Sequence, residues 1–202
     1  MARPILLSVL LAVAASAAHA EDAADQAALT EKAKAMFAAT AAATCDEGDA
    51  AAAPDIHAIG FRYSYDSPED PERTAHLFRF FCLGGAYNEI HVYYIADDDG
   101  MLSPLYFAEP SYDVRYAGDT DEKVEAISVT GFAANGQLVN SGYDPQARTI
   151  TAHSQWRGVG DASSIGTWVF VDGGFRLVRY EVDASYDGEI NPQVLLDHST
   201  AP

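Results

Sequence analysis

The chain has 202 residues, of which 30 are acidic and 12 are basic, and its formal net charge is −18 at pH 7. A negative field of this size repels nucleic acid and anionic membrane surfaces, so it argues against partners of those classes. It favours cationic partners, divalent ions or simply solubility. The length suits one domain with a sizeable core and is short for two.

Residues 1–20 have the pattern of a secretory signal peptide. Arg3 supplies the positive charge, an apolar run extends from Ile5 to Ala18, and Ala18-His19-Ala20 offers the small residues of a cleavage site. The run is shorter than the roughly 20 residues that a membrane-spanning helix needs. We therefore expect a periplasmic protein with no membrane span in the mature chain.

Cleavage after Ala20 would leave 11 basic and 30 acidic residues, a net charge of −19. Residues 21–53 then form an alanine-rich helix and a linker. The helical composition covers Glu21 to Thr44, and Asp46 to Pro54 reads as the linker. The apolar stripe of the helix is thin, which predicts weak docking; its best members are Leu29, Ala33, Met36 and Phe37.

The chain has two cysteines, Cys45 and Cys82, and both follow the predicted signal peptide. Because exported proteins fold in an oxidising compartment, we expect a disulfide between them. Such a bond would contribute roughly 3 to 4 kcal/mol, mainly by restricting the unfolded chain.

Residues 54–202 are expected to form a β-rich domain, because short aromatic and β-branched runs alternate here with turn residues. Glu89 to Ala96 is apolar on both faces, which predicts burial on both sides. The fold class is therefore all-β: an antiparallel meander forming a sandwich or partial barrel, preceded by one short N-terminal helix. A β-propeller is an alternative fold, although the sequence has no repeat of fixed period that would support it. The predicted strands are Ala58–Tyr65, Thr74–Leu83, Glu89–Ala96, Leu105–Phe107, Val124–Thr130, Gln137–Asn140, Thr149–Gln155, Thr167–Val171 and Phe175–Val182.

The glycine-rich segment from Gly158 to Phe175 contains two motifs that suggest chemistry. Gly158-Val159-Gly160 begins like a dinucleotide-binding loop, and Ala162 to Gly166 resembles a nucleophile elbow around Ser164. Both motifs need a helix directly afterwards, whereas Thr167 to Val171 has the composition of a strand. His198, which follows in the order of a catalytic triad, lies in a polar tail. We therefore expect no catalytic residues, no cofactor and no enzymatic activity.

Metal sites are not indicated by the spacing of the carboxylates and histidines. Asp97-Asp98-Asp99-Gly100 lacks the alternating ligands and the later Glu of an EF-hand, so it is interpreted as an acidic hairpin tip. The histidines after the signal peptide form no close pair in sequence, although His76 and His91 would approach if the Gly84-Gly85 turn paired their strands suitably. We expect no metal.

Four segments together resemble one exported bacterial family, the domain of unknown function 1176. They are CLGGAYN at Cys82–Asn88, LVNSGYDPQARTIT at Leu138–Thr151, RGVGD at Arg157–Asp161 and GTWVFVDGGFRLV at Gly166–Val178. The resemblance implies a periplasmic β-rich domain with no assigned activity. It also implies a second disulfide that this chain lacks, because Ala162 and a residue near Ser185 or Tyr186 stand where the family has cysteines. Leu83 replaces a usual Trp.

The most favoured function is a non-catalytic binding or interaction module whose partner is unknown; the charge of the chain favours a cationic periplasmic or secreted protein. An inhibitor of a cationic hydrolase such as lysozyme is the alternative, because the charge would steer a basic enzyme. A hydrolase is less favoured, since no acid–base pair stands out by spacing. The polar residues that match the family are the candidate binding residues: Arg157, Asp161, Tyr87, Asn88 and Asp144. A local structural role would also explain Asp144 in its turn, Asn88 as a local hydrogen-bonding residue, and an Arg157–Asp161 pair that braces the loop.

Overall fold

The structure is a computed structural model, and it describes residues 8–45 and 53–199. It begins with helix α1 (Ser8–Thr40) and a short 3-10 helix, η1 (Ala42–Thr44). Twelve strands follow in the described residues: β1 (Asp55–Phe61), β2 (Arg73–Gly84), β3 (Glu89–Ala96), β4 (Leu102–Pro104), β5 (Phe107–Tyr116), β6 (Val124–Asn135), β7 (Gln137–Val139), β8 (Gly142–Asp144), β9 (Thr149–Gln155), β10 (Ser163–Val171), β11 (Gly174–Asp183) and β12 (Gln193–Asp197).

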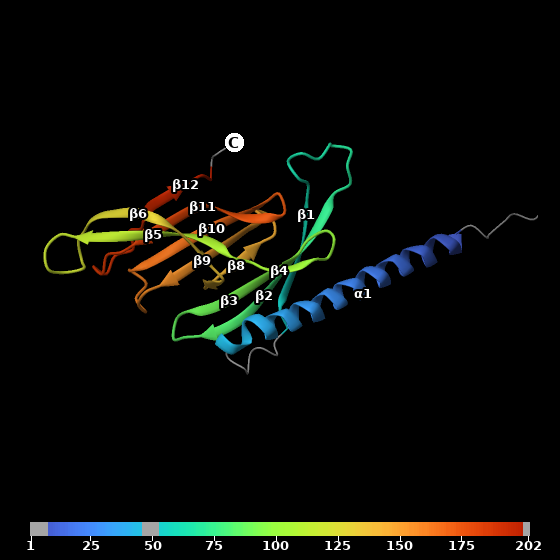
Figure 1. Ribbon diagram of the computed structural model, residues 1–202, viewed down its shortest axis with the longest axis horizontal. Helices are drawn as coiled ribbons and strands as arrows, with labels where there is room; N and C mark the ends of the chain where they lie inside the picture. The colour runs from blue at the N-terminus through green and yellow to red at the C-terminus, as the bar shows by residue number, and fades with distance from the viewer. Residues whose placement is uncertain (1–7, 46–52, 200–202) are drawn as a thin grey trace, which may run out of the picture.

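The strands form three antiparallel groups (Figure 1). The first sheet has the order β1-β2-β3-β4, with β7 also paired to β3. The second sheet has the order β12-β11-β10-β9-β8, and β5 pairs with β6 as a separate ribbon. The expected all-β class, with antiparallel pairing and an N-terminal helix, is confirmed, and the described strands do not close into a barrel.

The main core lies between the two larger sheets. Tyr93 and Ile95 of β3 belong to the same buried cluster as Ile150 of β9 and Trp168 of β10. Val92 and Tyr94, on the opposite face of β3, join a second cluster with α1. The predicted burial of both faces of β3 is therefore confirmed, because a sheet covers one face and a helix covers the other.

Helix α1 packs on the first sheet through its C-terminal part. Ala33 is fully buried, and the Phe37 ring stacks on Phe80 with 4.7 Å between the ring centroids. The Thr40 hydroxyl lies 2.7 Å from the Tyr94 hydroxyl. The docking is firmer than the thin apolar stripe suggested, because aromatic residues of the sheet complete the contact. The helix begins before the predicted residue 21, and the predicted linker lies largely outside the described residues.

The predicted disulfide is present. Cys45 and Cys82 are joined with an S–S distance of 2.00 Å, and they are 37 residues apart in sequence. The bond connects the segment after η1 to β2 near its C-terminal end, beside the helix–sheet contact. The contact between the helix and the first sheet is thus held by a covalent bond and an apolar cluster.

Several strand boundaries differ from the prediction. The predicted strand at Leu105–Phe107 is wrong, because β4 ends at Pro104 and β5 begins at Phe107. β5 was missed since Pro110 and the charged residues of this segment do not resemble a strand, yet Asp113 and Arg115 are exposed in β5 and Glu109 is half-buried. β1 ends at Phe61 because Tyr63 and Asp66 form a turn. β4, β8 and β12 were also missed, because each is a short strand of five residues or fewer.

Candidate functional site

The loop between β9 and β10 is organised by an ion pair between two of the predicted binding residues. Arg157 Nε donates to Asp161 Oδ1 at 2.6 Å, and Nη2 donates to the second carboxylate oxygen. Asp161 is 1% exposed and also accepts a hydrogen bond from the Gly188 N–H at 2.7 Å. The Arg157 guanidinium holds the pKa of the Asp161 carboxyl well below its usual range. The pair therefore fixes the loop and ties it to the segment after β11.

Aromatic side chains surround this ion pair. The Arg157 guanidinium lies 5.2 Å from the centre of the Tyr186 ring, and Trp156 lies beside the same ring. The Tyr87 ring packs on Gly158, where an added Cβ would be 3.4 Å away. Arginine, tyrosine and tryptophan contribute most of the binding energy in many protein interfaces. We call this group the tyrosine–arginine surface: Tyr87, Trp156, Arg157, Val159 and Tyr186.

Asn88 and Asn140 fix the backbone next to Tyr87 through hydrogen bonds. Asn88 Nδ2 donates to the Gln155 carbonyl at 2.8 Å, and Asn88 Oδ1 accepts from Asn140 Nδ2 at 2.8 Å. Asn140 adopts the left-handed region, with φ 44°, and its side chain accepts from the Glu89 N–H at 2.7 Å. Asparagine tolerates this conformation better than most residues. The two asparagines thus join the start of β3 to the end of β9.

The fifth predicted binding residue, Asp144, lies elsewhere. Its Oδ1 accepts from the N–H groups of Gln146 and Ala147 at 2.8 and 3.2 Å, in the turn between β8 and β9. This is the local role that an Asp in a turn usually has. The structure therefore brings Arg157, Asp161, Tyr87 and Asn88 together and leaves Asp144 apart.

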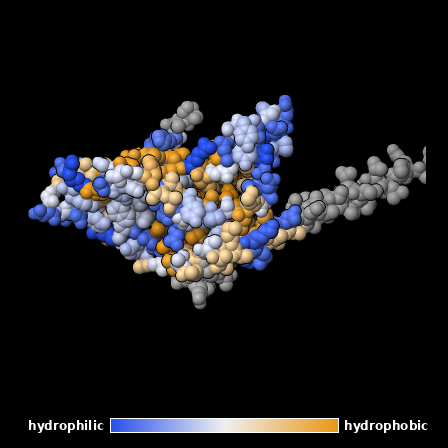
Figure 2. All heavy atoms as spheres, viewed as in Figure 1, coloured by the Kyte–Doolittle hydropathy of each residue, from blue (hydrophilic) through white to orange (hydrophobic). Residues whose placement is uncertain are grey.

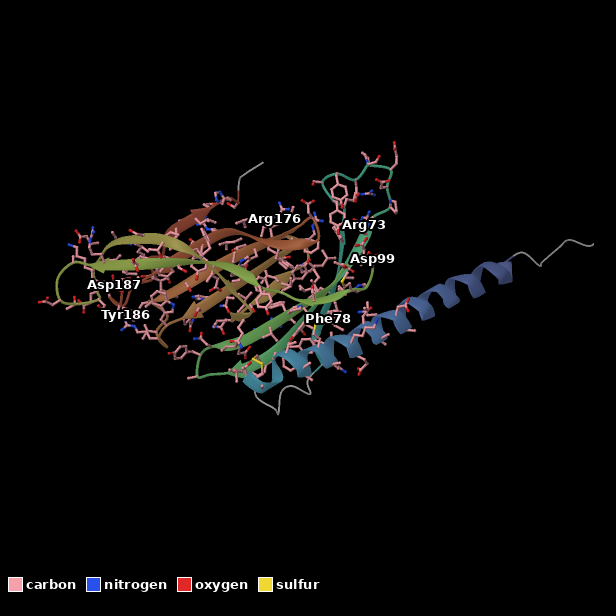
Figure 3. The ribbon with its side chains drawn as sticks, viewed as in Figure 1. Arg73, Phe78, Asp99, Arg176, Tyr186 and Asp187 are labelled. Carbon is pink, nitrogen blue, oxygen red and sulfur yellow. A yellow bond between two sulfur atoms is a disulfide. The ribbon has the colours of Figure 1, made fainter. Side chains whose placement is uncertain are left out.

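Tyr186 and Trp156 belong to the surface, although sequence reasoning did not select them. Figure 3 shows Tyr186 and Asp187 at the end of the molecule opposite Arg73 and Asp99. The sequence signal for Tyr186 was the implied missing disulfide, which pointed to Ala162 and the Ser185–Tyr186 segment, whereas no sequence signal pointed to Trp156. Ser163 pairs with Asp183, so Ala162 does lie beside that segment. The Asp161–Gly188 bond connects the same two parts of the chain.

A polar pocket lies between the β5–β6 ribbon and the second sheet, and no sequence pattern indicated it. Its volume is about 110 Å³. Trp168 and Gly166 form part of the lining, together with hydroxyl, amide and carboxyl groups from β5, β6, β7, β9, β10 and β11. The polar side chains are Glu109, Asn135, Gln137, Ser154, Ser164 and Tyr180.

Glu109 is the ionisable carboxyl group of this pocket. Burial raises the pKa of Glu109, against the opposing effect of a 3.3 Å hydrogen bond from Asn135 Nδ2. Among the residues that the structure describes, no basic side chain pairs with Glu109. A carboxyl group with a raised pKa in a pocket is a recognised mark of a functional site.

The two catalytic motifs considered from the sequence have no matching geometry. Residues 163–171 form strand β10, so Ser164 lies in a strand and no helix follows it. The expected strand after Gly166 is confirmed, although it begins at Ser163, earlier than Thr167. A dinucleotide-binding loop and a nucleophile elbow both require a helix at this point.

Asp97 to Gly100 forms the tip between β3 and β4, as predicted. Asp97 Oδ1 accepts from the N–H groups of Asp99 and Met101, while Asp98 pairs with Arg73 at 2.5 Å. His76 lies opposite Ala96 in the sheet, and His91 lies opposite Phe81, so the pairing register separates the two histidines. In residues 8–45 and 53–199, no group of three or more metal-binding side chains converges.

An acidic groove lies between α1, the start of β2 and the β3–β4 tip. Its volume is about 740 Å³. Four carboxyl side chains line it, with Arg73 and His76 as the basic residues; the acids are Asp25, Glu72, Asp97 and Asp98.

Among the described helices, none has the length and apolar composition needed to cross a membrane.

Comparison with known proteins gives one finding about the family. A family model described as "Protein of unknown function (DUF1176)" matches residues 8–190. No curated protein and no solved structure matches the chain significantly. The match covers most of the sequence and includes all the segments that form the tyrosine–arginine surface. The chain therefore belongs to the DUF1176 family of proteins of unknown function.

Proposed function

We propose that this chain is an exported binding module that recognises a partner protein through the tyrosine–arginine surface. The observation that carries the proposal is the convergence of Tyr87, Trp156 and Tyr186 around the fixed ion pair that Arg157 forms with Asp161. Tyr87 is 45% exposed and Val159 is 71% exposed, so the surface offers both aromatic and aliphatic area to a partner. The sequence of residues 1–20 supports export to the periplasm.

The rigidity of this surface supports a role in binding. The Arg157–Asp161 pair and the Asn88–Asn140 pair hold the backbone beneath the exposed Tyr87 ring and the half-buried Trp156 and Tyr186 rings. A surface that is ordered before binding loses less conformational entropy when a partner docks. Large aromatic side chains on such a base provide contact area at low entropic cost.

Affinity capture from a periplasmic extract tests the proposal, with Tyr87→Ala as the variant and Tyr65→Ala as the matched control. Tyr65 is 77% exposed and lies outside the surface, in the loop between β1 and β2. We expect a protein that the wild type and Tyr65→Ala retain, at low and at high salt, and that Tyr87→Ala loses. A partner bound equally by all three proteins would contradict the assignment of this surface.

An inhibitor of a cationic hydrolase such as lysozyme is a second candidate, and the acidic groove favours it. The groove carries four carboxyl side chains against one arginine and one histidine, and it adds a local negative surface to a negative chain. Such a field accelerates association with a basic protein and is weakened by salt.

Calorimetry with a basic lysozyme at low salt tests this candidate. We expect heat of binding and a loss of lytic rate, both reduced at high salt. The variant Asp97→Asn with Asp98→Asn should weaken binding, whereas Asp113→Asn with Asp119→Asn, on and after β5 outside the groove, should change it less. No heat and an unchanged lytic rate would exclude lysozyme inhibition.

A further inference from the structure

The polar pocket has the chemistry of a site for a small cation. Glu109 contributes a carboxyl group, and the hydroxyls of Ser154, Ser164 and Tyr180 contribute further acceptor oxygens. The described residues place no lysine, arginine or histidine in its lining. In a partly buried site, an ionised carboxylate without a counter-ion is costly, so a bound cation would recover that cost.

The wall of the pocket suits an organic cation. Trp168 lines the site, and its ring is held in place because Nε1 donates to the Ala108 carbonyl at 2.9 Å. Indole is the aromatic group that attracts ammonium ions most strongly. The volume of about 110 Å³ accommodates three or four groups of water size, since a water occupies about 30 Å³ in the liquid.

We propose that this pocket binds a small primary ammonium group, with Glu109 as its counter-ion and the hydroxyls of Ser154, Ser164 and Tyr180 as acceptors of its N–H groups. An ammonium group has three N–H donors, and the Glu109 carboxylate with the three hydroxyls offers enough acceptors for all of them. The site is separate from the tyrosine–arginine surface and does not depend on it.

The test is an NMR titration of the full mature chain with methylammonium chloride. The Trp168 indole N–H signal reports on the pocket, and the variant Trp156→Phe assigns it, because the chain has only two tryptophans. We expect a saturable shift with a dissociation constant on the order of 1–10 mM, as befits a ligand of two heavy atoms. Sodium chloride at equal ionic strength should leave the signal in place.

Two variants with the same change in charge make the test specific. Glu109→Gln keeps the size and the acceptor of the Asn135 bond, and it should raise the dissociation constant at least tenfold. Asp113→Asn removes an exposed carboxylate from the same strand, β5, and should change it less than twofold. Tetramethylammonium, whose nitrogen has no N–H group and which has five heavy atoms, should not bind.

An ammonium group can come from a free amine or from a lysine side chain of a partner. A parallel titration with N-acetyl-Gly-Lys-Gly-amide, whose only ammonium group is the lysine side chain, distinguishes these sources, since tighter binding of the peptide indicates a lysine and tighter binding of methylammonium indicates a free amine. The proposal is overturned if neither ligand shifts the Trp168 signal, if sodium chloride reproduces the shift, or if Glu109→Gln binds as well as the wild type.

Discussion

Two regions of this molecule are stabilised in different ways. In the apolar region, α1 buries Phe37 against Phe80, and the Cys45–Cys82 disulfide joins the helix segment to β2. In the polar region, the β9–β10 loop is fixed by the Arg157–Asp161 ion pair and by hydrogen bonds to the backbone. Hydrophilic residues cover the far end of the β5–β6 ribbon and the loop between β1 and β2 (Figure 2). The apolar, covalently linked region gives stability, whereas the polar, ordered region also presents groups that a partner can contact.

Removal of the disulfide should have the largest effect on stability. We expect Cys45→Ala with Cys82→Ala to lower the free energy of unfolding by about 3–4 kcal/mol, because the bond closes a loop of 37 residues in the unfolded chain. Urea denaturation measures this loss, and treating the wild type with a reductant should reproduce it. An unchanged urea midpoint would show that the stability of the apolar region does not depend on its covalent bond.

The core between the two larger sheets should be nearly as sensitive. At Gly166, an added Cβ would lie 2.3 Å from the Trp168 indole, which is buried and hydrogen-bonded. Gly166→Ala should therefore cost about 1–3 kcal/mol through overpacking. Gly174→Ala, on the neighbouring strand β11, is the control, since nothing lies within 4 Å of its added Cβ. Equal urea midpoints for the two variants would mean that the indole moves freely.

In the polar region, Asp161→Asn should lower the melting temperature because it removes the charge that pairs with Arg157. Asp144→Asn is the control, since Asp144 only caps a turn. The pKa of Asp161 is lowered in the folded state, so its stabilisation is present above the unfolded pKa and is lost as the pH falls through the folded pKa. The difference between wild type and Asp161→Asn should thus shrink towards acidic pH. A constant difference from neutral to acidic pH would contradict the ion pair.

Glu109 should show the opposite pH dependence and a smaller effect. Burial raises its pKa, so its contribution is fully present below the unfolded pKa and is lost as the pH rises through the folded pKa. Tyr112 and Tyr180 are the titratable groups facing it, and burial raises the pKa of both, so they stay neutral over this range. Without ligand, the stability of Glu109→Gln relative to wild type should increase from pH 3 to pH 7 in thermal melts. A decrease would mean that the carboxylate has a cationic partner.

Much of the fold followed from local chemistry in the sequence. The boundaries of β3 and β9 were predicted to the residue, because apolar and β-branched runs end there at turn residues. β5 was not predicted, since its pattern depends on where the ribbon packs and not on its own composition. Likewise, the docking of α1 depends on aromatic residues that β2 and β3 supply.

The candidate site was predictable only in part. The sequence spacing of Arg157 and Asp161 allowed an ion pair, and Asn88 suggested a local hydrogen bond. Tyr186 joins them through the register of β10 and β11, which no local pattern specifies. The Glu109 pocket assembles residues from six strands, so sequence proximity gave no sign of it.

Amide hydrogen exchange at Gly188 tests most directly whether the polar region is ordered by the Arg157–Asp161 ion pair. The Gly188 N–H donates to buried Asp161, and it is the bond that links the β9–β10 loop to the segment after β11. The account predicts slow exchange in the wild type, comparable with amides inside β10, and fast exchange in Asp161→Asn. Fast exchange in the wild type would contradict a preformed surface in the polar region.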